Sequence, residues 1–216
     1  ADGFTKEYPD IRFVGLPGTI DNDLYGTDLT IGFDTAVNTA IEAVDKIRDT
    51  ADSHNRIFFV EVMGRHAGFI ALNTGIGGGA SNVIIPEEES SIMDIVKVID
   101  KSKKRNKLFS VIIVAEGSKL GSASEIATKI DEHYGELRTR VAVIGHLQRG
   151  GSPSAVDRIL SSRLGYAAVL ALLNGKNNVM LGVKNNEISH TPFHDAINKH
   201  KNLNNDLLEM AKILAQ

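Results

Sequence analysis

RIFFVEVM, residues 56–63, is a near-continuous apolar run that ends at the glycine of GRH, residues 64–66. A strand with one face in water alternates apolar and polar residues, whereas a strand covered on both faces does not need to. The run therefore predicts a strand in the interior of a parallel sheet. A helix is predicted to follow, over about residues 65–75.

The same alternation of short apolar runs and helical periodicities extends along the chain. Strands are predicted at residues 11–16, 82–85, 108–115, 140–145 and 179–184, in addition to 56–63. Helices are predicted at residues 30–52, 91–103, 122–134, 154–174, 193–200 and 205–215, in addition to 65–75. This order predicts an α/β fold, doubly wound, with mainly parallel sheets and helices on both faces.

The composition is that of an ordinary globular protein, with 42% apolar and 24% charged residues among 216. A net charge of −3 and one short basic run, KSKKRNK at 101–107, do not favour a nucleic-acid partner. Without cysteine there is no disulfide framework, and no run is long enough to span a membrane. We expect a cytoplasmic protein. The missing initiator Met suggests a cut inside a longer one.

Unusual polar residues follow four of the predicted strands. In open parallel sheets, ligands bind beyond the carboxyl ends of the strands. The residues at these ends are GTIDND at 18–23, Gly64, Arg65 and His66, Glu116 and Gly117, and His146, Gln148, Arg149, Gly150 and Gly151. We expect them to share one rim.

Four arginines, at positions 56, 65, 140 and 149, lie at strand ends or starts. Arginine suits bidentate binding of phosphate oxygens, and adjacent glycines let backbone N–H groups approach an anion. The helix starting near Ser154 adds its positive end. Each arginine taken alone is equally compatible with an ordinary salt bridge. Together they favour an anionic ligand.

The loop GLPGTIDNDLYGTD, residues 15–28, carries two carboxylates two positions apart. Asp21 is placed to accept a proton from a substrate hydroxyl, and Asp23 to hold Mg²⁺. Thr19 and glycine amides would stabilise a transferring phosphoryl group. The alternative is an Asx turn in which Asp21 and Asn22 bond their own backbone. Joined to the arginines, the loop indicates phosphoryl transfer onto a phosphorylated small molecule.

Four segments resemble the 6-phosphofructokinase family: PGTIDND at 17–23, TIGFDTA at 30–36, EVMGRHAG at 61–68 and GHLQRGGSPSAVDR at 145–158. The resemblance implies transfer of phosphate from ATP to the 1-hydroxyl of fructose 6-phosphate, a step of glycolysis. It also implies two Rossmann-like lobes, the first of them incomplete. Residues 1–32 and 148–198 would belong to the nucleotide-binding lobe. Residues 33–147 and 199–216 would form the sugar-phosphate-binding lobe.

The resemblance also assigns roles. Asp21 would be the catalytic base, Thr19 would contact the fructose or the phosphoryl group, Asp23 would support Mg²⁺, and Arg65 would neutralise the reacting phosphates. The sugar phosphate would be bound by Met63, Gly64, Glu116, His146 and Arg149. Arg56 and Arg140 would reach the 6-phosphate of a neighbouring subunit, which implies a homotetramer and an allosteric enzyme.

Two departures from the family matter. The N-terminal third, with the glycine-rich GGDGS loop that binds ATP phosphates and magnesium, is missing, so these residues alone are predicted to have little or no kinase activity. At the effector site Arg48, Arg105 and Lys107 agree with the basic positions of bacterial members, but Ser81 replaces an acidic residue. We therefore do not expect standard activation by ADP.

The phosphate donor follows from one residue. Pyrophosphate-dependent members tend to have Lys where this chain has Gly18, and glycine leaves room for the longer phosphate chain of ATP. A pyrophosphate-dependent phosphotransferase stays the alternative. A second alternative is a non-catalytic regulatory subunit, against which the two retained aspartates argue.

Overall fold

A computed structural model describes residues 7–8, 10–51, 56–105, 109–135 and 139–215. The chain folds into two compact units, each built from two stretches of sequence: Ala1–Thr35 with Ser152–Asn202, and Ala36–Gly151 with Leu203–Gln216. The observed boundaries between the units fall after residues 35, 151 and 202. The boundaries expected from the sequence fell after residues 32, 147 and 198, which is three or four residues earlier in each case. The assignment of a nucleotide and a sugar phosphate to the two units stays a prediction.

The second unit contains a four-stranded parallel sheet in the order β5-β6-β4-β7. Its strands are β4 (Ile57–Val62), β5 (Asn82–Ile84), β6 (Ser110–Ala115) and β7 (Arg140–Val143). Its helices are most of α2 (Phe33–Ala51), with α3 (Phe69–Gly77), α4 (Ile92–Lys104), α5 (Ala123–Tyr134) and α8 (Asn205–Leu214), and a 3-10 helix η1 (Gly145–Arg149).

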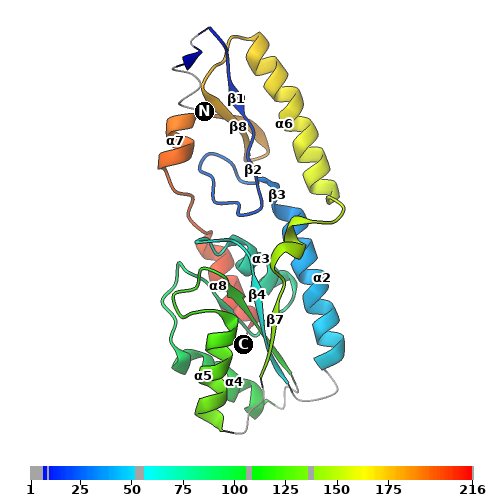
Figure 1. Ribbon diagram of the computed structural model, residues 1–216, viewed down its shortest axis with the longest axis vertical. Helices are drawn as coiled ribbons and strands as arrows, with labels where there is room; N and C mark the ends of the chain where they lie inside the picture. The colour runs from blue at the N-terminus through cyan, green and yellow to red at the C-terminus, as the bar shows by residue number, and fades with distance from the viewer. Residues whose placement is uncertain (1–6, 9, 52–55, 106–108, 136–138, 216) are drawn as a thin grey trace. The chain divides into compact units, whose positions relative to one another are not determined.

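Both faces of the sheet are largely buried along its inner strands, β4 and β6. On one face Phe59 and Ile112 pack against Ile99 of α4 and Ile126 of α5, and all four are fully or almost fully buried. The alternate positions, such as Val60 on the other face, are buried as well. Figure 1 shows the helices around the sheet. The sequence prediction of a doubly wound α/β fold is thus confirmed, and RIFFVEVM is its interior strand.

The first unit contains a three-stranded sheet, β1 (Val14–Gly15), β8 (Val179–Lys184) and β9 (Glu187–Pro192). Strands β1 and β8 are parallel, whereas β8 and β9 form an antiparallel hairpin. A separate parallel pair joins β2 (Gly18–Thr19) to β3 (Ile31–Gly32). Helix α6 (Ala155–Leu173) packs on β8 through Leu164 and Leu181, and α7 (Phe193–Asn198) follows β9 (Figure 1).

Several predicted boundaries were wrong. The helix expected from residue 65 begins at Phe69, because a tight turn occupies residues 64–66. The strand expected at 11–16 has two residues, and the one expected at 140–145 ends at Val143, where η1 takes over. Strand β9 was missed, since EISHTP is polar and ends in proline. Its hairpin turn uses Asn185 and Asn186 at φ of 50° and 64°, as two-residue hairpins require.

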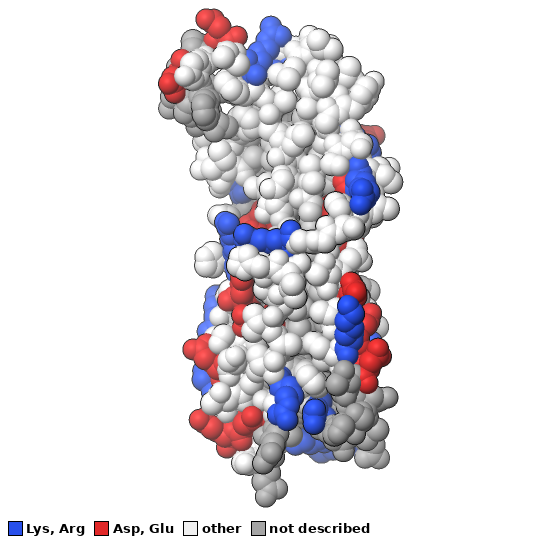
Figure 2. Space-filling view, turned by 45° about the vertical axis from the view of Figure 1, so that its right-hand side comes forward, with Lys and Arg blue, Asp and Glu red and all other residues white. Residues whose placement is uncertain are grey.

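The outer face of α6 is largely apolar and exposed. Figure 2 shows a broad area of this helix without charged side chains. The exposed apolar residues of α6 are Val156, Ile159, Tyr166, Val169, Leu170 and Leu173. Contiguous apolar patches of this kind are typical of contact surfaces. Among the described residues, no helix combines the length and apolarity that crossing a membrane would need.

The core of the second unit can be tested with two isoleucines. Replacement Ile112→Ala, at a side chain with 0% exposure, should lower the free energy of unfolding by about 2–5 kcal/mol, because it leaves a cavity. Ile213→Ala, at 65% exposure, should change it by less than about 0.5 kcal/mol. Urea unfolding followed by circular dichroism measures both. Equal losses would contradict the placement of Ile112 in the core.

Candidate functional site

The carboxyl ends of β6, β4 and β7 meet at one edge of the sheet of the second unit. The backbone N–H of Glu116 donates to the carbonyl of Val62 over 3.0 Å, and that of Ile144 donates to Glu61 over 3.0 Å. The residues that follow these strands are therefore neighbours: Met63, Gly64 and Arg65 after β4, Glu116 after β6, and His146 and Arg149 in η1 after β7. The predicted rim exists within this unit.

Glu116 holds the turn that follows β4. Its Oε1 accepts hydrogen bonds from the backbone N–H groups of Gly64 (3.2 Å) and Arg65 (2.7 Å). The N–H of Ala67 closes the turn by donating to the carbonyl of Gly64 over 2.9 Å. Gly117 brings the two loops together, since a Cβ there would collide with the carbonyl oxygen of Arg65. The position of the Arg65 backbone is thus fixed from the neighbouring strand end.

The backbone of Arg65 adopts a left-handed conformation, with φ of 52°. Five non-glycine residues in the described part of the chain have positive φ: Asn22, Arg65, Asn178, Asn185 and Asn186. Asparagine tolerates this conformation, whereas arginine does so at a cost. The Arg65 side chain is exposed. A strained backbone beneath an exposed guanidinium suggests that the side chain is needed at this place.

Gln148 gives η1 its position. Its side chain is 1% exposed, accepts from the backbone N–H of Met63 over 2.8 Å, and donates to the carbonyl of Ala36 over 3.4 Å. His146 and Arg149 of the same short helix are exposed. Within GHLQRGG, one residue therefore anchors the segment from inside, and two basic side chains stand on its outside.

The four arginines do not form one cluster. Arg56 directly precedes β4, and Arg140 is the first residue of β7, where it pairs with Phe58. Because these strands are parallel, both arginines lie at the amino edge of the sheet, opposite Arg65 and Arg149. Within one copy of the unit, the four arginines are therefore divided between the two edges of the sheet. A site that uses all four requires more than one copy of this unit.

The loop after β2, in the first unit, combines turn-forming and buried polar groups. Thr19 Oγ1 accepts from the backbone N–H of Asp21 over 3.2 Å. Asn22 is 4% exposed, donates to the carbonyl of Asp28 over 3.2 Å and accepts from the N–H of Thr30 over 3.0 Å. The side chain of Asp21 is 7% exposed, while Asp23 is exposed. Asn22 thus closes the loop through the backbone of residues further along the chain, and these bonds are not the local Asx turn of the alternative.

Lys201 is a cation beside this loop that sequence reasoning missed. Its Nζ donates to the carbonyl of Asp28 over 2.7 Å, and the preceding residue, His200, forms a β-bridge with Leu24. Burial lowers the pKa of Lys201 to about 8, although the nearby carboxylates of Asp28 and Asp23 act in the opposite direction. The sequence around Lys201 did not indicate its contact with the loop, because that contact joins residues far apart in the chain.

The predicted effector residues are only partly described. Arg48 hydrogen-bonds the carbonyl of Gly78 and lies 5.9 Å from the ring centre of Phe109. Ser81 is buried and donates its N–H to Val111, so it lies at the start of β5. Arg105 is exposed at the end of α4, and Lys107 lies outside the described residues. The effector site stays a prediction.

The expected metal site can be compared with the acidic groups present. Among the described residues, no cluster of three or more His, Asp or Glu side chains could hold a metal ion. Mg²⁺ commonly uses one or two carboxylates and takes its other ligands from water and substrate phosphates. The exposed carboxylate of Asp23 fits that limited role. The predicted gathering of Asp21 with Arg65, Glu116 and His146 joins residues of different units and stays a prediction.

A doubly wound sheet with exposed arginine and histidine side chains at its carboxyl edge, and a loop with two aspartates, are typical of α/β proteins that bind phosphorylated ligands. The family model described as phosphofructokinase matches residues 1–172. The chain therefore belongs to the phosphofructokinase family, as its motifs indicated.

Individual relatives agree with this assignment. The chain is 54% identical over 202 residues to ATP-dependent 6-phosphofructokinase 1 of Thermus thermophilus, covering 94% of this chain and 62% of that protein. The solved structure of phosphofructokinase from Saccharomyces cerevisiae is similar over 99% of this chain and 29% of its own, at 30% identity and a TM-score of 0.82. The pyrophosphate-dependent phosphofructokinase of Marinobacter aquaeolei shares 27% identity over 94% of this chain and 57% of its own, with a TM-score of 0.80. The chain spans less than two thirds of the curated relative's length.

Lys201 predicts how stability depends on pH. The folded chain loses this proton at about pH 8 and the unfolded chain near 10.5, so the unfolded state binds more protons between these values. Stability from this group therefore rises with pH across that window, and Lys201→Met should remove the rise.

The measurement is the free energy of urea unfolding at about pH 8 and about pH 10 in wild type and variant. Lys199→Met is the matched control, because Lys199 is ion-paired with Asp195 over 2.9 Å, which raises its pKa. A rise that persists in Lys201→Met would contradict the burial of the Lys201 ammonium.

Proposed function

We propose that the complete protein transfers the terminal phosphoryl group of ATP to the 1-hydroxyl of fructose 6-phosphate, giving fructose 1,6-bisphosphate in glycolysis in the cytoplasm. The observation that carries this proposal is the Thr19–Asp23 loop, which holds two aspartates in a segment that matches the family. The relative from Thermus thermophilus, named as an ATP-dependent 6-phosphofructokinase, supports the same reaction.

Asp21 is the proposed catalytic base. It removes the proton of the attacking sugar hydroxyl, which contributes roughly 10²–10⁴-fold to such reactions. Its N–H is bonded to Thr19 Oγ1, so the hydroxyl of Thr19 also orders the segment that carries the base. Asp23 supports the proposed Mg²⁺, with the phosphates supplying the other ligands. When bound, the ion neutralises charge on the transferring group.

The sugar phosphate is proposed to bind at the carboxyl edge of the β4 sheet. His146 and Arg149 bind the 6-phosphate, and the guanidinium of Arg65 faces the charge of the reacting phosphates. Glu116 already uses Oε1 to hold two backbone N–H groups, so Oε2 is the oxygen proposed to accept from a sugar hydroxyl. Met63 and Gly64 seat the ring.

Arg56 and Arg140 support an oligomer. They lie at the opposite edge of the sheet from Arg65 and Arg149, so the same copy of the unit does not bring them to one ligand. We propose that they bind the 6-phosphate held by a neighbouring subunit, in a homotetramer. Sugar affinity would then depend on how the subunits are arranged, which gives cooperativity a physical basis.

The base is tested with Asp21→Asn in the complete protein. The variant keeps the size of the side chain and cannot accept the proton, so kcat should fall by about 10²–10⁴-fold. Binding of fructose 6-phosphate, measured by calorimetry, should persist. Asp206→Asn, in the exposed first turn of α8, serves as the control and should keep wild-type turnover. Wild-type turnover in Asp21→Asn would remove this residue from its proposed role.

The donor is tested at Gly18, which is exposed, and a Cβ there would meet no atom within 4 Å. The fold should therefore accept Gly18→Lys. The added ammonium would occupy the space proposed for the longer phosphate chain of ATP, so kcat/KM with ATP should fall by about tenfold or more, whereas that with pyrophosphate should not fall. Product formation with each donor is the measurement. A wild-type protein that uses pyrophosphate and not ATP would establish the alternative.

A further inference from the structure

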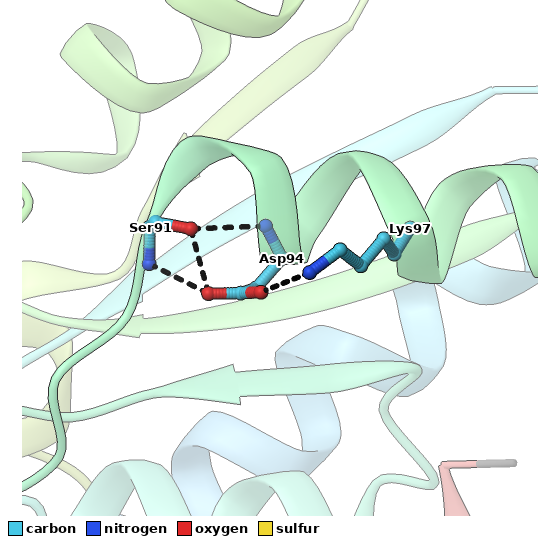
Figure 3. Close-up of polar contacts among 3 residues, drawn as sticks. All are labelled: Ser91, Asp94 and Lys97. Atoms are coloured by element: carbon cyan, nitrogen blue, oxygen red, sulfur yellow. Dashed lines mark hydrogen bonds and ion pairs between the residues drawn. The ribbon is translucent and has the colours of Figure 1, made fainter.

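Three helices of this chain begin with the sequence Ser-x-x-Asp or Ser-x-x-Glu, which predicts a capping box. In α4 the box is complete: Asp94 N–H donates to Ser91 Oγ over 3.2 Å, and Asp94 Oδ2 accepts from the N–H (3.2 Å) and hydroxyl (2.6 Å) of Ser91 (Figure 3). In α5, Ser122 and Glu125 form the same reciprocal pair. The acid of each box serves its own helix.

In α6 the box is only half formed. The N–H of Asp157 donates to Ser154 Oγ over 3.2 Å, as expected. The N–H of Ser154, however, donates to Thr35 Oγ1 over 3.0 Å instead of to the carboxylate of Asp157. The carboxylate of Asp157 is directed to another part of the chain, and the residue is only 3% exposed. This buried acid has no role in the proposed reaction.

The carboxylate caps the start of α2 instead. Oδ1 accepts from the N–H of Gly32 over 2.8 Å, and Oδ2 accepts from the N–H of Thr35 over 2.8 Å and from its hydroxyl. Gly32 directly precedes α2 and has φ of 105°, a backbone conformation that favours glycine. Because glycine has no side chain, this residue cannot cap the helix itself. From α6, Asp157 therefore accepts both N–H groups that a capping box within α2 would have satisfied.

The capped segment is also one end of the loop that carries Asp21. Gly32 pairs with Thr19 in the β2–β3 ladder, and Thr19 Oγ1 accepts from the N–H of Asp21. Two bonds from Asn22, to Asp28 and Thr30, close the loop between them. Hydrogen bonds and one strand pairing therefore connect Asp157 through Gly32 and Thr19 to the backbone of Asp21.

We propose that Asp157 is a positioning residue for the base loop, residues 19–32: its carboxylate fixes Gly32 and, through the β2–β3 pairing, the position of Asp21. The proposal rests on the proposed function, in which Asp21 takes the proton. A displacement of about 1 Å at a reacting group can cost about 10²-fold in rate. Loss of the carboxylate should therefore lower turnover more than it lowers binding of the sugar phosphate, whose proposed 6-phosphate ligands, His146 and Arg149, belong to the other unit.

Asp157→Asn in the complete protein is the principal test. It keeps the shape of the side chain and turns one of its acceptor oxygens into a donor, which cannot bind the N–H groups of α2. We expect kcat to fall at least about tenfold per folded molecule, with KM for fructose 6-phosphate within about twofold of wild type. Hydrogen exchange of amides 19–32 should become faster.

Asp94→Asn is the matched control. It removes an acid that accepts from one N–H and one hydroxyl at a helix start, whereas Asp157 accepts from two N–H groups and one hydroxyl. The helix of Asp94, α4, belongs to the other unit. Exchange in residues 19–32 and kcat should both stay at wild-type values. If Asp157→Asn behaves like Asp94→Asn, with full turnover and unchanged exchange, the role assigned to Asp157 is wrong.

Two further experiments test the role of Asp157 if Asp157→Asn does not fold or if the wild-type protein is inactive. If Asp157→Asn does not fold, Thr35→Val replaces it, because this variant removes only the hydroxyl contacts and keeps both backbone bonds. A smaller fall in kcat with faster exchange is expected, and wild-type values of both would overturn the proposal. If the wild-type protein transfers no phosphate, the proposed function fails. Exchange in Asp157→Asn then decides by itself whether Asp157 orders the loop, and unchanged protection would refute it.

Discussion

The pairing of β4 with β6 on one side and β7 on the other is the constraint on which the second unit depends. Parallel strands end at a common edge, so this register places the residues after Val62, Ala115 and Val143 side by side. A shift of one residue in a strand would exchange its two faces and disrupt the packing on both of them. The buried core therefore fixes the backbone from which the exposed His146 and Arg149 extend.

Four polar side chains hold the loops, and each does so by accepting backbone N–H groups. Glu116 holds the Arg65 turn, Gln148 holds Met63, Asn22 holds Thr30, and Asp157 holds the start of α2. Buried N–H groups in irregular segments need such partners, because no ladder or helix supplies them. Much of the polarity near the candidate site is thus structural. The side chains proposed to bind phosphate groups, Arg65, His146 and Arg149, are exposed, whereas Asp21 is buried.

The fold class and the family could be predicted from the sequence, because apolar runs report interior strands directly and the motifs are long. Strand β9 could not, since EISHTP pairs in the sheet through its backbone despite a polar composition. The two edges to which the arginines belong follow from strand direction, because Arg56 precedes its strand whereas Arg65 follows it. Asp157 was missed because Ser-x-x-Asp predicts a contact within one helix, and only the structure shows the carboxylate turned to a segment more than a hundred residues away.

The left-handed backbone at Arg65 also has a consequence for protein engineering. Glycine occupies that region at no steric cost, so replacing this arginine would relieve strain while deleting a guanidinium. Screening for thermal stability alone would favour glycine at this position, whereas screening for activity would retain arginine if Arg65 has its proposed role. At this one position, the residue that favours stability differs from the residue proposed to favour activity.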